Sequence, residues 1–284
     1  SRGLGDVYKR QRLFRNILSF VLPRPNVFLL MAFSSKIIKP FSFLFPQFLR
    51  NALNLMPSKI PGKKIKEKKI YEVTNGKKVS RVALLTGCVQ RVISPEINES
   101  TIRLLNRHNV EVVVMPDINC CGSLNHHLGK KKLAHKSFKN NIESWHEEYL
   151  KNGLDAIISN TSGCGPTLKD YGHIFKNDKD LKKKAKKISE LTKDITEYLD
   201  ENLKLNININ SEKKYRIAYH SACSMQHGQK VHNQPKELIS KTGNEVLEIP
   251  EGHLCCGSAG TYNILQQKMA KSLLKNKVKN IEKI

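Results

Sequence analysis

The feature that most constrains this chain is a cysteine pattern that occurs twice. A single cysteine is followed by thirty-one residues and then by Cys-Cys-Gly, once from Cys88 to Gly122 and again from Cys223 to Gly257. A shift of 135 residues superposes the two copies, including the serine after each glycine. Because the shared spacing extends over three cysteines, it indicates an internal duplication in which each copy is one structural unit.

Strand patterns precede the cysteines in both copies. In the first copy, RVALLT (81–86) leads to Cys88 and VEVVVMP (110–116) leads to Cys120; RIAYHSAC and NEVLEIP take the corresponding places in the second. A third strand at 156–159 leads to Cys164, and helices are expected at about 94–109 and 130–150. Strands that alternate with helices predict an α/β fold: a duplicated cysteine-rich domain, each half a mainly parallel sheet with flanking helices, after a helical N-terminal segment.

Composition and pattern divide the chain into four parts. Residues 1–11 match nothing that follows and are interpreted as a non-native leader, and 12–78 form a helical, Phe-rich linker segment. The first cysteine-rich domain is expected at 79–205 and the second at 212–284. At the same shift, a counterpart of Cys164 would lie beyond Ile284. We therefore expect an incomplete second domain and a chain that is a piece of a longer protein.

The N-terminal segment has an unusual composition. Eight of the ten phenylalanines lie between Phe14 and Phe48, and no Asp or Glu occurs from Val7 to Lys66. Its longest purely apolar run is seven residues, far short of the roughly 20 that a membrane span needs, and its prolines predict short helices with bends. The segment either packs on a neighbouring domain or subunit, which we favour, or makes peripheral contact with an anionic membrane through residues 12–60.

The cysteines point to metal or redox chemistry in a reducing compartment. Their number is odd, two pairs are adjacent, and no signal peptide precedes them, so a disulfide framework is disfavoured and a cytoplasmic location is expected, on the inner face of the membrane if the segment contacts lipid. All seven are candidate ligands: Cys88, Cys120, Cys121, Cys164, Cys223, Cys255 and Cys256.

Four thiolates at one edge of the first sheet suit two kinds of centre. A [4Fe–4S] cluster and a closed zinc site both take four cysteines, and the spacing alone leaves both open, with dithiol chemistry as a third interpretation. Glycines beside the cysteines, such as Gly87 and Gly122, let backbone N–H groups reach sulfur, which favours the cluster.

The net charge of +24 does not by itself indicate a nucleic-acid partner. Lysine, asparagine and isoleucine are abundant throughout the chain, which is typical of a general compositional bias. No zinc-finger, RRM or helix-turn-helix signature accompanies the charge, so we expect no nucleic acid.

The motifs around the cysteines resemble those of the cysteine-rich (CCG) domain family, and within it the iron–sulfur subunits of glycolate oxidases. The family also includes a cysteine-rich component of heterodisulfide reductase and the lactate-utilisation proteins. The matching motifs are TGCVQ (86–90), SPEIN (94–98), CCG (120–122), NNIESW (140–145), SGCG (162–165), KDYGHIFKND (169–178), QHGQK (226–230) and HLCCGSAGTY (253–262).

The resemblance implies an electron-transfer role. It implies an iron–sulfur subunit of a flavin-dependent glycolate (2-hydroxy acid) oxidase or dehydrogenase, with electrons passing from flavin-containing subunits toward a membrane acceptor. Substrate and flavin would be bound on other chains, and no catalytic residue is expected here. A zinc-stabilised scaffold subunit and a thiol redox protein similar to heterodisulfide reductase are the alternatives.

Overall fold

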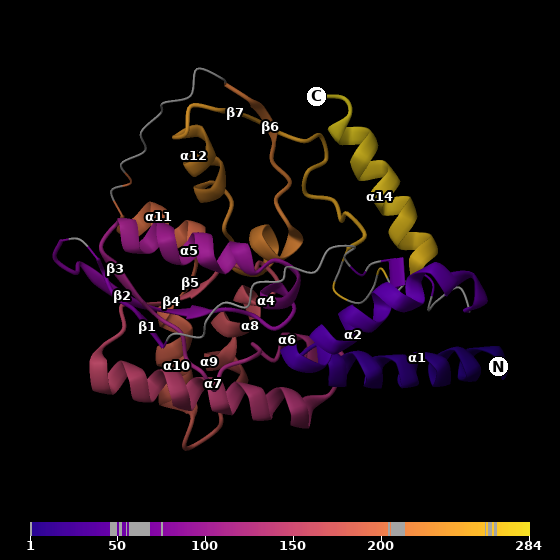
Figure 1. The fold of residues 1–284 in the computed structure, drawn as a ribbon, viewed down its shortest axis with the longest axis horizontal. Helices are drawn as coiled ribbons and strands as arrows, with labels where there is room; N and C mark the ends of the chain where they lie inside the picture. The colour runs from indigo at the N-terminus through magenta and orange to yellow at the C-terminus, as the bar shows by residue number, and fades with distance from the viewer. Residues whose placement is uncertain are drawn as a thin grey trace.

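The computed structural model describes residues 2–45, 50, 53–54, 56, 69–74, 76–203, 205, 214–258, 260, 263 and 266–284. Within them, a five-stranded sheet forms the centre of the molecule (Figure 1). Its order is β1-β3-β2-β4-β5, and all neighbours pair parallel except β1 with β3. The strands are β1 (Ile70–Tyr71), β2 (Ser80–Leu85), β3 (Val110–Val113), β4 (Ala156–Ser159) and β5 (Thr192–Asp194).

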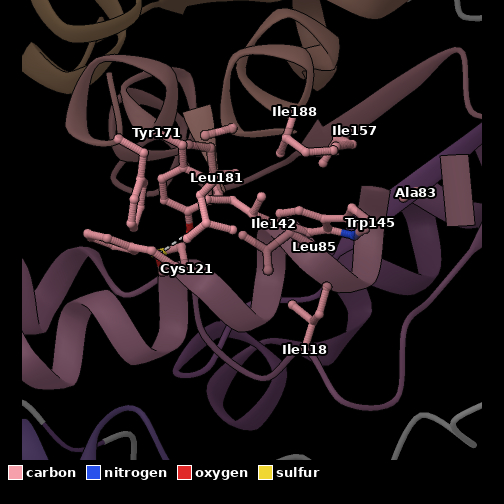
Figure 2. Close-up of a cluster of buried hydrophobic side chains, with 14 of the residues drawn as sticks. Ala83, Leu85, Ile118, Cys121, Ile142, Trp145, Ile157, Tyr171, Leu181 and Ile188 are labelled. Atoms are coloured by element: carbon pink, nitrogen blue, oxygen red, sulfur yellow. Dashed lines mark hydrogen bonds between the residues drawn. The ribbon is translucent and has the colours of Figure 1, made fainter. Parts of the chain in front are cut away.

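Helices cover both faces of this sheet (Figure 1). Ala83 and Leu85 of β2 pack with α7 (Lys131–Asn152) and α10 (Lys182–Leu191), whereas Val82 and Leu84 pack with α5 (Pro95–Arg107) and α11 (Ile195–Asn202). Since successive strand residues point to opposite faces, a strand buried on both sides reads as an uninterrupted apolar run. That run is what the sequence shows, and Figure 2 shows the core on the α7 side, around Trp145.

The second copy repeats the first in its strands and long helices. Strand β6 (Arg216–Ala218) pairs parallel with β7 (Glu245–Leu247), followed by α14 (Gln267–Ile281), and α12 (Gln234–Ser240) lies between the two strands in sequence as α5 does in the first copy. The register is also the same, because Arg81 lies opposite Glu111 and Arg216 opposite Glu245. The predicted fold class, a duplicated α/β unit, is therefore confirmed.

The structure refines the shift between the copies. The paired glutamates, Glu111 and Glu245, are 134 residues apart, whereas the cysteines are 135 apart. The second copy thus has one more residue between β7 and its Cys-Cys-Gly. The domain bounds 79–205 and 212–284 stay a prediction, and residues 206–213 lie outside the described residues.

Two short strands were not predicted: β5 has three residues and β1 two. Helices α6 (Ser123–His127), α8 (Gly165–Lys169) and α9 (Tyr171–Ile174) are each one turn long. Ser94 does precede α5, with Pro95 at its first turn, but the Ser94 side chain makes no capping bond. A full capping box instead begins α11, where the side chains of Asp194 and Glu197 each accept from the backbone at the other end of the first turn.

The N-terminal helices dock on the first repeat. They are α1 (Arg2–Val21), α2 (Pro25–Ile38) and the 3-10 helix η1 (Lys39–Leu44). Phe28 of α2 is buried with Val21 and with Val92 of α4 (Gln90–Ile93), the helix that follows Cys88. The bends predicted from the prolines are present between these helices. Within the described residues, however, the stretch Pro25–Leu44 is long and apolar enough by composition to cross a membrane, with 17% of it buried.

A buried arginine joins the strands of the first repeat. Arg81 is 6% exposed; its Nε donates to Glu111 Oε1 at 2.6 Å, and the same guanidinium pairs with Glu148. Replacing Arg81 with alanine should lower the free energy of unfolding by about 3–5 kcal/mol, because the buried Glu148 loses its cation and Glu111 keeps only the half-exposed Lys78. Urea denaturation followed by circular dichroism measures this loss.

The matched control is the equivalent residue of the second repeat. Arg216 pairs with Glu245 at 3.5 Å, but both side chains are more than 60% exposed. Arg216→Ala should therefore cost about 1 kcal/mol or less. Equal losses in the two variants would show that burial does not distinguish the two ion pairs.

Candidate metal centre

Three adjacent strands of the first sheet end beside one another. Strand β2 leads to Cys88, β3 leads to Cys120 and Cys121, and β4 leads to Cys164. Because β3, β2 and β4 are neighbours and run parallel, their carboxyl ends meet at one edge, which is where such sheets build their sites.

The thiols of these four cysteines converge. The Sγ atoms of Cys121 and Cys164 are 3.1 Å apart, and Cys120 lies within hydrogen-bonding reach of both Cys88 and Cys121. The structure therefore brings together the four residues that the sequence placed at this edge. Their role as ligands stays a prediction.

Cys120 is the thiolate of the group. Hydrogen bonds from Cys121, from Cys88 and from the Gly122 N–H lower the pKa of Cys120 to about 3, against the opposing effect of burial. The same contact with Cys120, together with burial, raises the pKa of both Cys88 and Cys121 well above the usual thiol value. The neighbouring donors thus favour a negative charge on the Cys120 sulfur.

Two buried side chains fix the backbone of the Cys-Cys pair. The Asn141 amide donates to the Cys120 carbonyl at 2.9 Å and to the Tyr171 hydroxyl at 3.1 Å. Tyr171 in turn donates to the Cys121 carbonyl at 2.6 Å (Figure 2). Neither role was predicted, although both residues lie in motifs, NNIESW and KDYGHIFKND, that carry the family resemblance. The motifs marked both residues, but the sequence did not show that they contact the backbone of Cys120 and Cys121.

The glycine of each Cys-Cys-Gly is required by its backbone. Gly122 has φ +82° and Gly257 has φ +84°, and their N–H groups donate to Cys120 and Cys255 sulfur at 3.4 and 3.3 Å. A Cβ on Gly122 would lie 2.5 Å from the Phe138 ring. The two copies therefore share a turn in which a left-handed glycine aims its amide at the first sulfur of the pair.

A polar network supports the Cys88 and Cys164 loops. The Asn98 amide donates to the Thr86 carbonyl at 2.8 Å, and the Asn160 amide donates to Asn98 Oδ1 at 2.9 Å. Gln90 bonds both Asn160 and Thr161. Thr161 thus connects the Cys88 and Cys164 loops by its hydrogen bond to Gln90.

The second site is more open. Cys223, Cys255 and Cys256 are each half-buried, whereas Cys120 and Cys121 are buried. Burial, followed by the negative charge of Cys255 and Cys256 nearby, raises the pKa of Cys223. The structure therefore gathers these three cysteines as well, with less protein around them than in the first site.

The donor set of the first site fits a thiolate-bound centre. In the described part of the chain, however, no group of three or more His, Cys, Asp or Glu side chains is arranged to hold a single metal ion. The sulfurs of Cys121 and Cys164, at 3.1 Å, are closer than the separation of about 3.8 Å expected for two thiolates on one tetrahedral zinc. The thiols are hydrogen-bonded to one another, and a metal centre would have to spread them.

Comparison with known families identifies the class of protein. The model of the cysteine-rich domain, CCG, matches residues 82–169 and 217–284, which together make up more than half of the chain. The chain belongs to this cysteine-rich domain family. The two matched ranges coincide with the two copies of the repeat.

Individual relatives show which members of the family the chain resembles. The chain is 33% identical over 272 residues to the glycolate oxidase iron-sulfur subunit of Escherichia coli (strain K12), covering 96% of this chain and 63% of the relative. It is 29% identical over 236 residues to the "Probable glycolate oxidase iron-sulfur subunit" of Bacillus subtilis (strain 168), covering 83% and 52%. Lactate utilization protein A of Geobacillus sp. (strain WCH70) is 24% identical over 205 residues, covering 72% and 83%. The family resemblance read from the motifs is confirmed, and the chain spans less than two thirds of the first two relatives.

Gly122→Ala should destabilise the first site for two separable reasons. A left-handed φ costs an alanine about 1–2 kcal/mol, and the new methyl group would press into Phe138, adding about 1–3 kcal/mol of overpacking. Gly129→Ala is the control for the first effect alone, because Gly129 has φ +75° and nothing within 4 Å of its added Cβ. Chemical denaturation of both variants should show the larger loss at Gly122; equal losses would mean that Phe138 gives way freely.

Proposed function

We propose that this chain is the iron–sulfur electron-transfer subunit of a flavin-dependent glycolate (2-hydroxy acid) oxidase or dehydrogenase. The observation that carries the proposal is the convergence of four cysteine thiols at one sheet edge, with the Cys-Cys-Gly turn repeated in the second half. The relatives named as glycolate oxidase iron-sulfur subunits support the choice of complex. The chain's part in the enzyme is electron transfer, and flavin and substrate belong to partner subunits.

The residues that would hold the centres follow from the geometry. The first site would use Cys88, Cys120, Cys121 and Cys164, and the second would use Cys223, Cys255 and Cys256. A [4Fe–4S] cluster bound by thiolates would supply one-electron redox chemistry. The chain's own contribution is electrostatic, because the N–H groups of the two Cys-Cys-Gly glycines draw negative charge from sulfur and burial shields Cys120 and Cys121 from water.

A thiol redox protein is the second candidate. The close contact of Cys121 and Cys164 sulfurs, beside a stabilised thiolate at Cys120, suits dithiol–disulfide exchange as well as ligation. A zinc-stabilised scaffold takes the same four cysteines. The three candidate functions differ in their absorption, so one spectrum separates them.

Protein purified without oxygen should be brown, with broad visible absorption that dithionite bleaches. Cys164→Ser should lower its iron content because one of four ligands is lost, whereas Ser100→Ala, on the exposed side of α5, should leave it unchanged. Iron analysis and the visible spectrum are the measurements. A colourless protein with stoichiometric zinc would establish the scaffold, and a colourless, metal-free protein with a reducible disulfide would establish the thiol redox protein.

We further propose that the chain works in the cytoplasm, in peripheral contact with the inner face of the membrane. Eleven of the twenty large apolar side chains exposed in the described residues lie between Leu13 and Leu44. The whole stretch Val7–Lys66 is basic and free of acidic residues. An exposed apolar segment whose own charged side chains are all basic complements anionic lipid.

Helix α2 would lie in the plane of the membrane surface and would not cross the bilayer. Phe28, Ala32 and Ser35 form the buried side of α2, and the first of these packs on α4. Crossing a bilayer would require this side to leave the first repeat. An in-plane helix keeps the contact and leaves Phe33, Ile37 and neighbours free to enter the lipid interface.

Phe41 and Phe43 are 56% and 67% exposed, so Phe41→Glu/Phe43→Glu should weaken binding to anionic vesicles more than tenfold, which corresponds to about 1.4 kcal/mol. The control pair Leu150→Glu/Tyr215→Glu, 70% and 59% exposed elsewhere, should bind as the parent does. Co-sedimentation with phosphatidylcholine vesicles, with and without phosphatidylglycerol, measures both. Equal weakening by the two pairs, or no binding by the parent, would contradict the assigned surface.

A further inference from the structure

The helices that follow Cys164 and Cys223 pack tightly against each other across the contact between the repeats. The π-helix η2 (Ser224–Gln229) begins directly after Cys223, and it packs on α8, which begins directly after Cys164. A Cβ added to Gly165 would lie 2.1 Å from Gln229 Oε1. A Cβ added to Gly228 would lie 2.7 Å from Pro166 Cγ. Two glycines, one from each repeat, therefore let the segments approach more closely than any other residue would allow.

Gln229 contacts one residue beside each of the two cysteine sites. It is 6% exposed, and its amide nitrogen lies 3.5 Å from the Ser162 carbonyl, two residues before Cys164. The same nitrogen is 3.3 Å from Met225 sulfur, two residues after Cys223, and 3.5 Å from Asp194 Oδ2. Its Oε1 is buried without a partner in the described structure. One side chain thus lies between the two cysteine loops with one polar atom unsatisfied.

Occupation of the first site must move the loop that Gln229 touches. The Cys121 and Cys164 sulfurs are closer than a shared metal permits, so they have to separate. Cys121 is 3% exposed and its carbonyl is held by Tyr171. Cys164 is half-buried at the start of a one-turn helix. Cys164 is the less anchored of the two cysteines, so its sulfur is the one that moves. The Cys164 loop packs directly against Gln229.

The second site gains from the same contact. Its sheet has two strands in the described residues, and its three cysteines are half-buried. The π-helix that carries Gln229 begins directly after Cys223 and packs against α8 of the first repeat. A metal that fixes the Cys164 loop against Gln229 therefore lowers the entropic cost of ordering Cys223. A metal bound at the second site lowers the cost of ordering the Cys164 loop in the same way.

We propose that the two cysteine sites bind metal cooperatively, with Gln229 as the positioning residue that couples them. This rests on the cysteine sites of the proposed function, but not on their holding iron. A coupling of the usual size raises the affinity of each site about 5–150-fold when the other is filled, and thermodynamic linkage makes the factor the same in both directions.

Cobalt(II) alone is the probe, because its thiolate complexes absorb strongly and need no cluster assembly. Three reduced, oxygen-free proteins are titrated: the full chain, a variant with the four first-site cysteines changed to serine, and one with the three second-site cysteines changed. In the full chain, each site should bind cobalt about 5–150-fold more tightly than it does alone. Identical affinities, tighter binding by the isolated sites, or no cobalt–thiolate absorption in the full chain would overturn the proposal.

Two further variants test the route. Gln229→Met keeps an unbranched side chain of similar length but removes the amide, and it should lower the coupling factor toward one. Gln226→Met is the control: Gln226 is also buried on η2, but it donates to the Ser221 carbonyl within its own repeat. Coupling that survives Gln229→Met, or that is lost equally in both variants, would refute the role of Gln229. A failure here beside iron-dependent colour would leave the proposed function standing, whereas coupled cobalt sites in a protein that never binds iron would refute only the proposed function.

Discussion

Parallel pairing of β3, β2 and β4 is the constraint on which the site depends. Only because these strands run in the same direction do three separate turns, those of Cys88, Cys120–Cys121 and Cys164, meet at one edge. The strands are held by burial on both faces and by Arg81 at their opposite end. The site is therefore built on strands that are paired on both sides and buried on both faces, and backbone hydrogen bonds set the positions of its cysteines.

The two repeats share the same arrangement of strands and cysteines, but more protein surrounds this arrangement in the first repeat than in the second. Register, the Arg–Glu ion pair and the Cys-Cys-Gly turn are the same in both. In the first repeat, β4 and β5 extend the sheet on the far side of β2, and two helices cover each face; in the described part of the second, β6 pairs only with β7. The difference explains why the ion pair is buried in the first copy and exposed in the second, and why the adjacent cysteines are buried in the first copy and only half-buried in the second.

The sequence predicted those parts that produce a long or repeated pattern. The strand at 80–85 contains an uninterrupted apolar run, and the helix at 131–152 runs for six turns, so each has a pattern long enough to recognise in the sequence. The convergence of four cysteines followed from the order of strands and turns. Strand β5, with residues Thr192–Asp194, has no such pattern, because three residues cannot show a period and its pairing with β4 is decided by tertiary packing.

Contacts between distant segments were beyond the sequence for a related reason. Asn141 and Tyr171 read as ordinary helix residues, and only the packing of α7 against α9 directs both at the Cys120–Cys121 backbone. The π-helix after Cys223 likewise has no local signature. It places Gln229 against Gly165, a glycine with an ordinary φ whose requirement comes entirely from the other repeat. A glycine of this kind looks dispensable in a single domain, and its meaning appears only when the duplicated halves are packed together. The duplication therefore does more than repeat a site, because it also supplies the surface through which one copy packs against the other.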